Sequence, residues 1–126
     1  LNTAAGVHFD PQVSARIHQL SIAAARDPTR ETVRKRLEWL MLDARNVTDE
    51  MVELRHRVYS QPGFAQTMAN IMCLHTAEYR LPNLLTDAEL AGIRAPTMVV
   101  WTTHDPGSSI AIGEGLARRI PGARFV

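Results

Sequence analysis

The chain has 126 residues, with 14 Lys and Arg against 13 Asp and Glu, and 45% of its residues are hydrophobic. This composition provides enough apolar material for a core, and it lacks the large basic excess that nucleic-acid binders usually carry. No apolar run approaches the length of a membrane span, and the single cysteine excludes an internal disulfide. We therefore expect no nucleic-acid partner, no membrane contact and a cytoplasmic location, since a lone thiol fits a reducing compartment.

Two amphipathic helices are predicted at the start of the chain. Residues 12–26 repeat apolar side chains at three- and four-residue spacing, which is typical of a helix with one buried face. Asp27 and Pro28 then offer a cap and a first helical residue for a second helix. That second helix runs through Val33 and Leu37 with polar residues opposite.

The middle of the chain predicts three more helical segments. Thr48 is expected to cap a third helix, which Gln61-Pro62-Gly63 interrupts. Residues 64–79 are predicted as one further helix, in which Cys73 is a buried, inert thiol. Residues 86–89 spell a capping box, Thr-Asp-Ala-Glu, that begins a single turn.

The pattern changes near residue 96. Residues 97–102 are short, apolar and β-branched, which favours a strand buried on both faces, and a turn-rich loop follows at 103–109. Residues 110–120 are predicted as a helix, and another strand begins at Ala123, so the fold class is α/β. One complete strand cannot close a parallel sheet, so the missing strands are expected from outside this chain, and both ends look cut.

Asp105 is the first candidate catalytic residue. It comes just after the predicted strand, and functional groups gather on loops at the carboxyl ends of such strands. A carboxylate there can accept a hydrogen bond from an imidazole and stabilise the imidazolium. The alternative is that Asp105-Pro106-Gly107 is simply a turn.

Arg55 is the candidate binding residue. Its neighbours three and four positions away on the helix are apolar or amphipathic, namely Met51, Val52, Val58 and Tyr59. A charge on such a stripe should have an anionic partner, because an unpaired buried charge is costly. The alternatives are a snorkelling side chain or a bridge to Glu50 or Glu53. His8 with Asp10, and His75 with Glu78, each lack the third ligand that a metal site needs.

Several segments resemble a known family. Residues 95–105, with the helix after them and residues 120–124, resemble the acid-bearing segment of the α/β-hydrolases. Residues 36–40, residues 47–51 and Arg55 resemble the lid of the meta-cleavage product hydrolases, and residues 1–6 match the strand end before that lid. The resemblance implies three parts, which are the end of a core strand and turn (1–8), a helical lid (9–84) and the C-terminal part of the hydrolase core (85–126).

The resemblance also implies an activity. Those hydrolases cleave a carbon–carbon bond in 2-hydroxy-6-oxo-hexa-2,4-dienoates, the ring-fission products of aromatic degradation. Asp105 would be the triad acid and Arg55 a substrate-binding residue, with a small-molecule substrate and no metal or organic cofactor. The chain has no Gly-x-Ser-x-Gly turn and no histidine matching the family's, so it alone is expected to be inactive. Thr102 stands where the family commonly has glycine, and the acid loop lacks its usual proline after Gly107.

Other interpretations stay open at this point. An esterase, a haloalkane dehalogenase or an epoxide hydrolase would share the acid loop but would have less reason for Arg55 in the lid. A non-catalytic helical binding module would unfold cooperatively as an isolated chain, whereas a fragment with unpaired sheet edges would be loose or would aggregate. The sequence also leaves open a homo-oligomer of the complete enzyme.

Overall fold

The structure is a computed structural model that describes residues 5–126, so the first four residues of the expected strand end and turn (1–8) lie outside the described residues. In chain order the helices are α1 (Pro11–Arg26), α2 (Arg30–Leu40), α3 (Asp49–Tyr59), α4 (Phe64–Met72), α5 (Ala77–Arg80), α6 (Asp87–Ala91) and α7 (Ile110–Arg119), and the strands are β1 (Met98–Val99) and β2 (Arg124–Phe125). Short 3-10 turns lie at Ala5–Val7, Ala44–Asn46, Cys73–His75 and Leu81–Asn83. The described chain is mostly helical with a small parallel sheet, which is compatible with part of an α/β fold.

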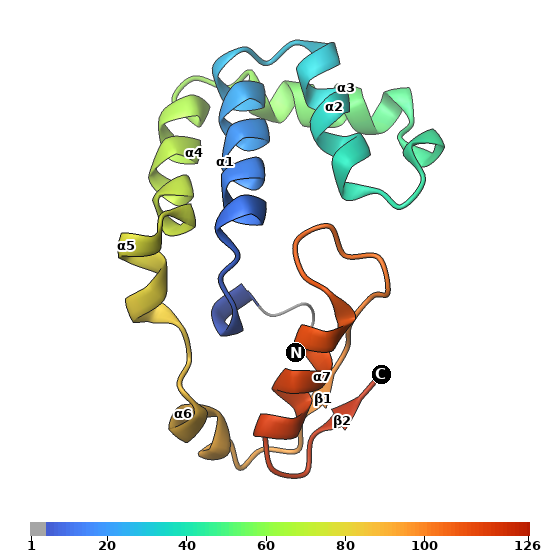
Figure 1. Ribbon diagram of the computed structural model, residues 1–126. Helices are drawn as coiled ribbons and strands as arrows, with labels where there is room; N and C mark the ends of the chain where they lie inside the picture. Colours follow the sequence, from blue (N-terminus) through green and yellow to red (C-terminus); the bar gives the residue numbers. More distant parts are fainter. Residues whose placement is uncertain (1–4) are drawn as a thin grey trace.

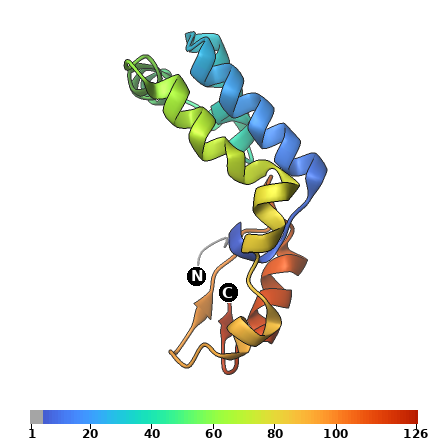
Figure 2. The same ribbon diagram turned by 90° about the vertical axis from the view of Figure 1, so that its left-hand side faces the viewer.

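The elements fall into two halves along the chain. Helices α1 to α5 form the helical half, in which α1 lies beside α4 and α2 packs against α3 (Figure 1). The C-terminal half contains α6, α7, β1 and β2, and Figure 2 shows it as a separate lobe at the foot of the helices. No helix in residues 5–126 is long and apolar enough to cross a bilayer.

The first two helices differ from the prediction at their starts. Asp10 caps α1, because its Oδ1 accepts hydrogen bonds from the backbone nitrogens of residues 12 and 13 at 2.8 and 3.0 Å. The prediction that Asp27 caps the second helix was wrong. Asp27 instead ends α1, with its backbone N–H bonded to the Ala23 carbonyl, and Thr29 caps α2 by accepting from the Thr32 nitrogen at 3.1 Å.

The predicted cap of α3 is confirmed, since Thr48 Oγ1 accepts from the Met51 nitrogen. The prediction of one helix over residues 64–79 was wrong, because α4 ends at Met72 and a 3-10 turn separates it from α5. Thr76 is extended at that break, and its hydroxyl donates to the Cys73 carbonyl, so the side chain competes with the helical ladder. The capping box at residues 86–89 is confirmed.

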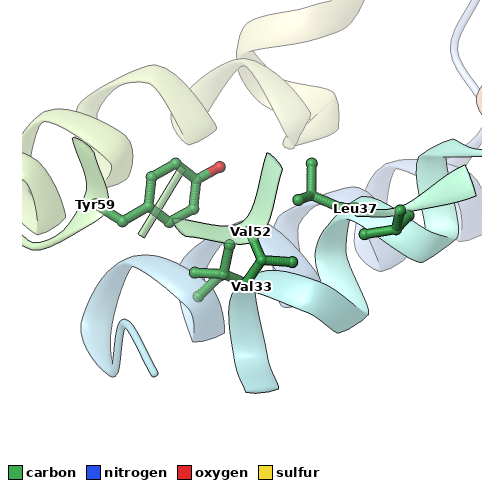
Figure 3. Close-up of a cluster of buried hydrophobic side chains, with 6 residues drawn as sticks. Val33, Leu37, Val52 and Tyr59 are labelled. Atoms are coloured by element: carbon green, nitrogen blue, oxygen red, sulfur yellow. The ribbon is translucent and has the colours of Figure 1, made fainter. Parts of the chain in front are cut away.

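Each half has its own apolar core. The core of the helical half consists of Ala24, Val33, Leu37, Val47, Val52 and Tyr59, four of which are labelled in Figure 3. The core of the C-terminal half consists of Leu90, Val99, Trp101, Leu116, Ala117 and Ile120. Burial of these side chains is the main force that holds each half together. The predicted division at residues 84 and 85 lies between the two cores and stays a prediction.

The β-loop-α-β unit predicted near the end of the chain is confirmed. Strands β1 and β2 are parallel, with Met98 opposite Arg124 and Val99 opposite Phe125. The strand is shorter than predicted, and burial on both faces was wrong. Val99 is 0% exposed, whereas Met98 is 45% and Val100 is 38% exposed. The cause is that α7 packs against both strands from one face of the sheet, while the side chains of Met98 and Val100 on the opposite face stay exposed.

A backbone hydrogen bond joins the chain where it enters and leaves the helical half. The Leu85 N–H donates to the Gly6 carbonyl at 2.8 Å. Val7 packs against the core of the C-terminal half, so residues before α1 also belong to that half. The helical half is therefore a continuous segment whose two ends lie side by side.

Candidate active site

Asp105 lies on the loop between β1 and α7, at the carboxyl end of the strand. Its Oδ1 accepts a hydrogen bond from the Gly107 backbone nitrogen at 2.7 Å, and the residue is half-buried. Residues 105–107 therefore form a turn, and this geometry is compatible with both interpretations of Asp105. Oδ2 of Asp105 has no hydrogen-bond partner among the described residues, so it can accept a proton donor from another group.

The loop that carries Asp105 is anchored by Trp101. The indole Nε1–H donates to the Ser108 carbonyl at 3.2 Å, and the ring itself is buried. Helix α7 approaches this ring so closely that a β-carbon on Gly113 would lie 2.5 to 2.8 Å from its atoms. Only glycine allows this contact, so α7 packs directly against the ring that anchors the Asp105 loop.

Asp105 faces a cleft between the two halves of the molecule. The cleft has a volume of about 390 Å³, which is within the range of small-molecule sites. Its apolar wall comes from α1, from α4 and from the turn after α4: Val13, Ile17, Ile71 and Leu74. Its polar lining comes from three places: His8 and Asp10 from the segment before α1, Ser14, His75 and Arg80 from the helical half, and Asp105, Gly107 and Ser108 from the loop after β1.

His75 lies in the cleft together with the cation of Arg80 and the carboxylates of Asp10 and Asp105. Burial lowers the pKa of the His75 imidazole from its ordinary value of 6.5, and the charges of Arg80, His18 and Arg36 lower it further. Arg80 is half-buried and makes no ion pair within residues 5–126. His75 is therefore held neutral to a lower pH than an exposed histidine.

Arg55 lies elsewhere. The expectation that it sits on the buried stripe of its helix was wrong, because Val52 and Tyr59 are buried while Arg55 is exposed. Its guanidinium carbon is 5.9 Å from the centre of the Tyr59 ring, and it has no ion pair in the part of the chain that the structure describes. The bridge to Glu53 does not form, since Glu53 pairs with Arg30 at 2.8 Å.

The structure does not bring Arg55 and Asp105 into one cavity. Arg55 lines a separate cavity of about 410 Å³ whose other walls are Leu37, Met51, Leu54 and Val58. The two candidate residues are thus in different halves and different cavities. A single small ligand bound in the Asp105 cleft would contact Arg80 and His75 rather than Arg55.

The sequence did not single out Arg36 or Arg80. Arg36 donates through Nε to Ser21 Oγ at 3.2 Å, and its guanidinium carbon lies 5.3 Å from the centre of the Trp39 ring. Its Nη1 is buried and has no partner among the described residues, and burial lowers its pKa. The sequence signal that could have identified Arg36 is its three-residue spacing from Trp39, which places both side chains on one face of the helix.

The prediction that Cys73 is buried was wrong, because the thiol is exposed at the end of α4. The broken helix is the reason, since the 3-10 turn at Cys73–His75 rotates this residue away from the helix packing. Within residues 5–126, no three His, Cys, Asp or Glu side chains are grouped so that they could hold a metal ion.

No family model matches this chain, and no solved structure matches it. The chain is 31% identical, over 97 residues, to rhodomycin D methylesterase DnrP of Streptomyces peucetius. The matched region is 76% of this chain and 32% of the methylesterase, so the chain spans about a third of that relative. That relative is named as an esterase, and the similarity contains nothing specific to the meta-cleavage product hydrolases.

Proposed function

We propose that this chain supplies the acid and the lid of a serine-type α/β-hydrolase, with Asp105 as the acid of a Ser-His-Asp triad. The observation that carries the proposal is the position of Asp105. It follows a parallel strand, lines a cleft and keeps Oδ2 available to a donor. The similarity to a methylesterase supports the hydrolase class.

The chemistry requires two groups beyond this aspartate. The Asp105 carboxylate would accept the Nδ1–H of a histidine, fix its tautomer and stabilise the imidazolium that forms when the histidine takes the serine proton. The serine and the histidine come from other parts of the complete protein, since this sequence has no Gly-x-Ser-x-Gly turn. The bound substrate would enter the cleft under the helical half, and no cofactor is required.

For the substrate we propose a 2-hydroxy-6-oxo-hexa-2,4-dienoate. The resemblance of residues 36–40 and 47–51 to the lid of the meta-cleavage product hydrolases supports this choice. In this reaction the dienol ketonises, the serine attacks the distal carbonyl, and the carbon–carbon bond breaks as the departing carbon takes a proton. Water then releases the acyl group. Arg55 lines a separate cavity in this structure, so for it to hold the carboxylate and 2-oxo end the helical half would have to close toward Asp105.

Ester hydrolysis is the second candidate, and the similarity to a methylesterase favours it. The same triad would attack an ester carbonyl, and the alcohol would leave in place of a carbon group. The two candidates differ in what they require of the lid. A neutral ester has no carboxylate, so Arg55 would have no anion to hold.

The assignment of Asp105 is tested by the turnover of the full-length protein. Asp105→Asn should lower kcat by about 10⁴-fold, because the amide favours the wrong histidine tautomer. The matched control is Asp10→Asn, which removes a charge from the same cleft while the amide oxygen still caps α1. Equal losses in the two variants, or full activity of Asp105→Asn, would contradict the assignment.

The substrate is tested with Arg55→Ala. If the enzyme cleaves dienoates, this variant should lose dienoate turnover and keep its turnover of an activated ester. Unchanged dienoate turnover would refute the role of Arg55 and the choice of substrate. A purified chain limited to these 126 residues should show no turnover above solvent with either substrate.

A further inference from the structure

Arg80 stands out among the basic residues because of where it lies. It is the last residue of α5, it is half-buried, and its side chain lines the cleft that Asp105 faces. The side chain makes no hydrogen bond or ion pair within residues 5–126. Several other cations of the chain are paired with acids: Arg30 with Glu53, Arg34 with Asp49, Lys35 with Glu31, Arg45 with Asp43 and Arg119 with Asp87.

The two acids that line the cleft are engaged with the backbone instead. Oδ1 of Asp10 accepts from two nitrogens at the start of α1, and Oδ1 of Asp105 accepts from Gly107. Neither forms an ion pair with Arg80. A half-buried guanidinium thus lines the cleft with its donors unused by the described residues, although a charge in such a place favours an anionic partner.

The rest of the cleft indicates what kind of anion would fit. The wall from α1 and α4 is apolar, through Ile17, Ile71 and Leu74. A fully hydrated inorganic ion would gain nothing from that wall, whereas an organic acid would bury its carbon body there. The lowered pKa of His75, to which Arg80 contributes after burial, places the positive charge close to the same wall.

We propose that Arg80 binds the carboxylate of an amphipathic small molecule whose apolar body lies against Ile17 and Ile71 in the Asp105 cleft. The guanidinium would hold the carboxylate through two parallel N–H···O bonds. The inference deepens the proposed function and rests on it only for the claim that this ligand is a substrate. It assigns the anion-binding role of this cleft to Arg80, because Arg55 lines a different cavity.

The experiment measures binding rather than turnover. Phenylacetate and its neutral counterpart phenylacetamide are titrated into the full-length protein by isothermal calorimetry, with Arg80→Gln, Arg80→Lys and the control Arg57→Gln. Arg57 is exposed, lines none of the cavities described above and forms no ion pair among the described residues. We expect phenylacetate to bind more tightly than phenylacetamide, and Arg80→Gln to remove that preference, a loss of about tenfold or more.

The remaining variants separate the explanations. Arg80→Lys should keep part of the preference, and Arg57→Gln should keep all of it. Equal phenylacetate affinity in Arg80→Gln and the parent, or an equal loss in Arg57→Gln, would overturn the proposal. Asp105→Asn should still bind phenylacetate in an Arg80-dependent way, so a failure of the proposed reaction would leave this result standing. An Arg80→Gln protein with an unchanged Tm shows that any loss is not due to unfolding.

Discussion

The Gly107 backbone N–H donates to Oδ1 of Asp105 at 2.7 Å, two residues back along the chain. One carboxylate oxygen therefore shapes the loop, and the other remains for a donor from elsewhere. The geometry of the loop needs only an acceptor at Oδ1, which an amide also provides. The structural role and the proposed chemical role of Asp105 can thus be separated by substitution.

We expect Asp105→Asn to leave the free energy of unfolding nearly unchanged, because the amide oxygen can still accept from Gly107. Asp105→Ala removes the acceptor and should cost about 1 kcal/mol. Urea unfolding of the full-length protein measures both values, and turnover should be lost in both variants. A stability loss in Asp105→Asn as large as that in Asp105→Ala would show that the charge itself holds the loop.

Gly113 and Gly115 give a matched pair on α7. A β-carbon at residue 113 would lie 2.5 Å from the Trp101 ring, whereas at residue 115 its nearest neighbour would be Nη2 of the flexible Arg118 side chain, at 3.9 Å. Gly113→Ala should destabilise the protein by about 1–3 kcal/mol through overpacking. Gly115→Ala should stabilise it by up to about 1 kcal/mol, since alanine favours a helix. Chemical denaturation tests the pair, and similar values for both variants would contradict the close packing.

The N-terminal caps of α6 and α7 differ in a measurable way. Thr86 Oγ1 accepts from the Glu89 nitrogen, and the Glu89 carboxylate accepts from the Thr86 nitrogen, whereas the Ser109 side chain makes no cap hydrogen bond. Thr86→Ala should therefore cost about 1 kcal/mol of unfolding free energy. Ser109→Ala is the control and should change little. An equal change in the free energy of unfolding for Thr86→Ala and Ser109→Ala would argue against the capping box.

His75 should make stability depend on pH. Its pKa is below the ordinary value of 6.5, first because of burial and then because of Arg80, His18 and Arg36. As the pH falls below 6.5, the His75 imidazole takes up a proton in the unfolded chain before it does so in the folded protein. The free energy of unfolding therefore decreases from pH 6.5 down to the pKa of His75 in the folded protein. His75→Gln should flatten the change in Tm over this window. The exposed His104 is the control, and an unchanged slope in His75→Gln would show that another group titrates.

Much of the secondary structure could be predicted because local chemistry determines it. The Thr48 cap and the box at residues 86–89 are satisfied by atoms within one helical turn, so the sequence alone shows them. The break after Met72 could not be read in that way. Residues 64–79 keep a helical apolar spacing, and only the competing hydrogen bond of Thr76 shows why the chain leaves the helix.

The site was predictable in part. The position of Asp105 after β1 could be predicted because a turn after an apolar strand is a local pattern, and Asp105 lines a cleft in the structure. The surroundings of Arg55 were misjudged because apolar neighbours along a helix do not determine which side faces the core. Arg80 was missed because its importance comes from residues far away in the sequence, the acids of the cleft among them, and no local spacing records that relationship.

The hydrogen bond from Leu85 to Gly6 has a consequence for how the molecule can vary and move. A segment whose two ends are adjacent can be lengthened, shortened or replaced without pulling apart the body to which it is attached. Because the two connections to the helical half lie side by side, its helices can rotate about them as one body. Opening and closing of the Asp105 cleft would then require changes at only two neighbouring points of the backbone, and neither apolar core would need to repack.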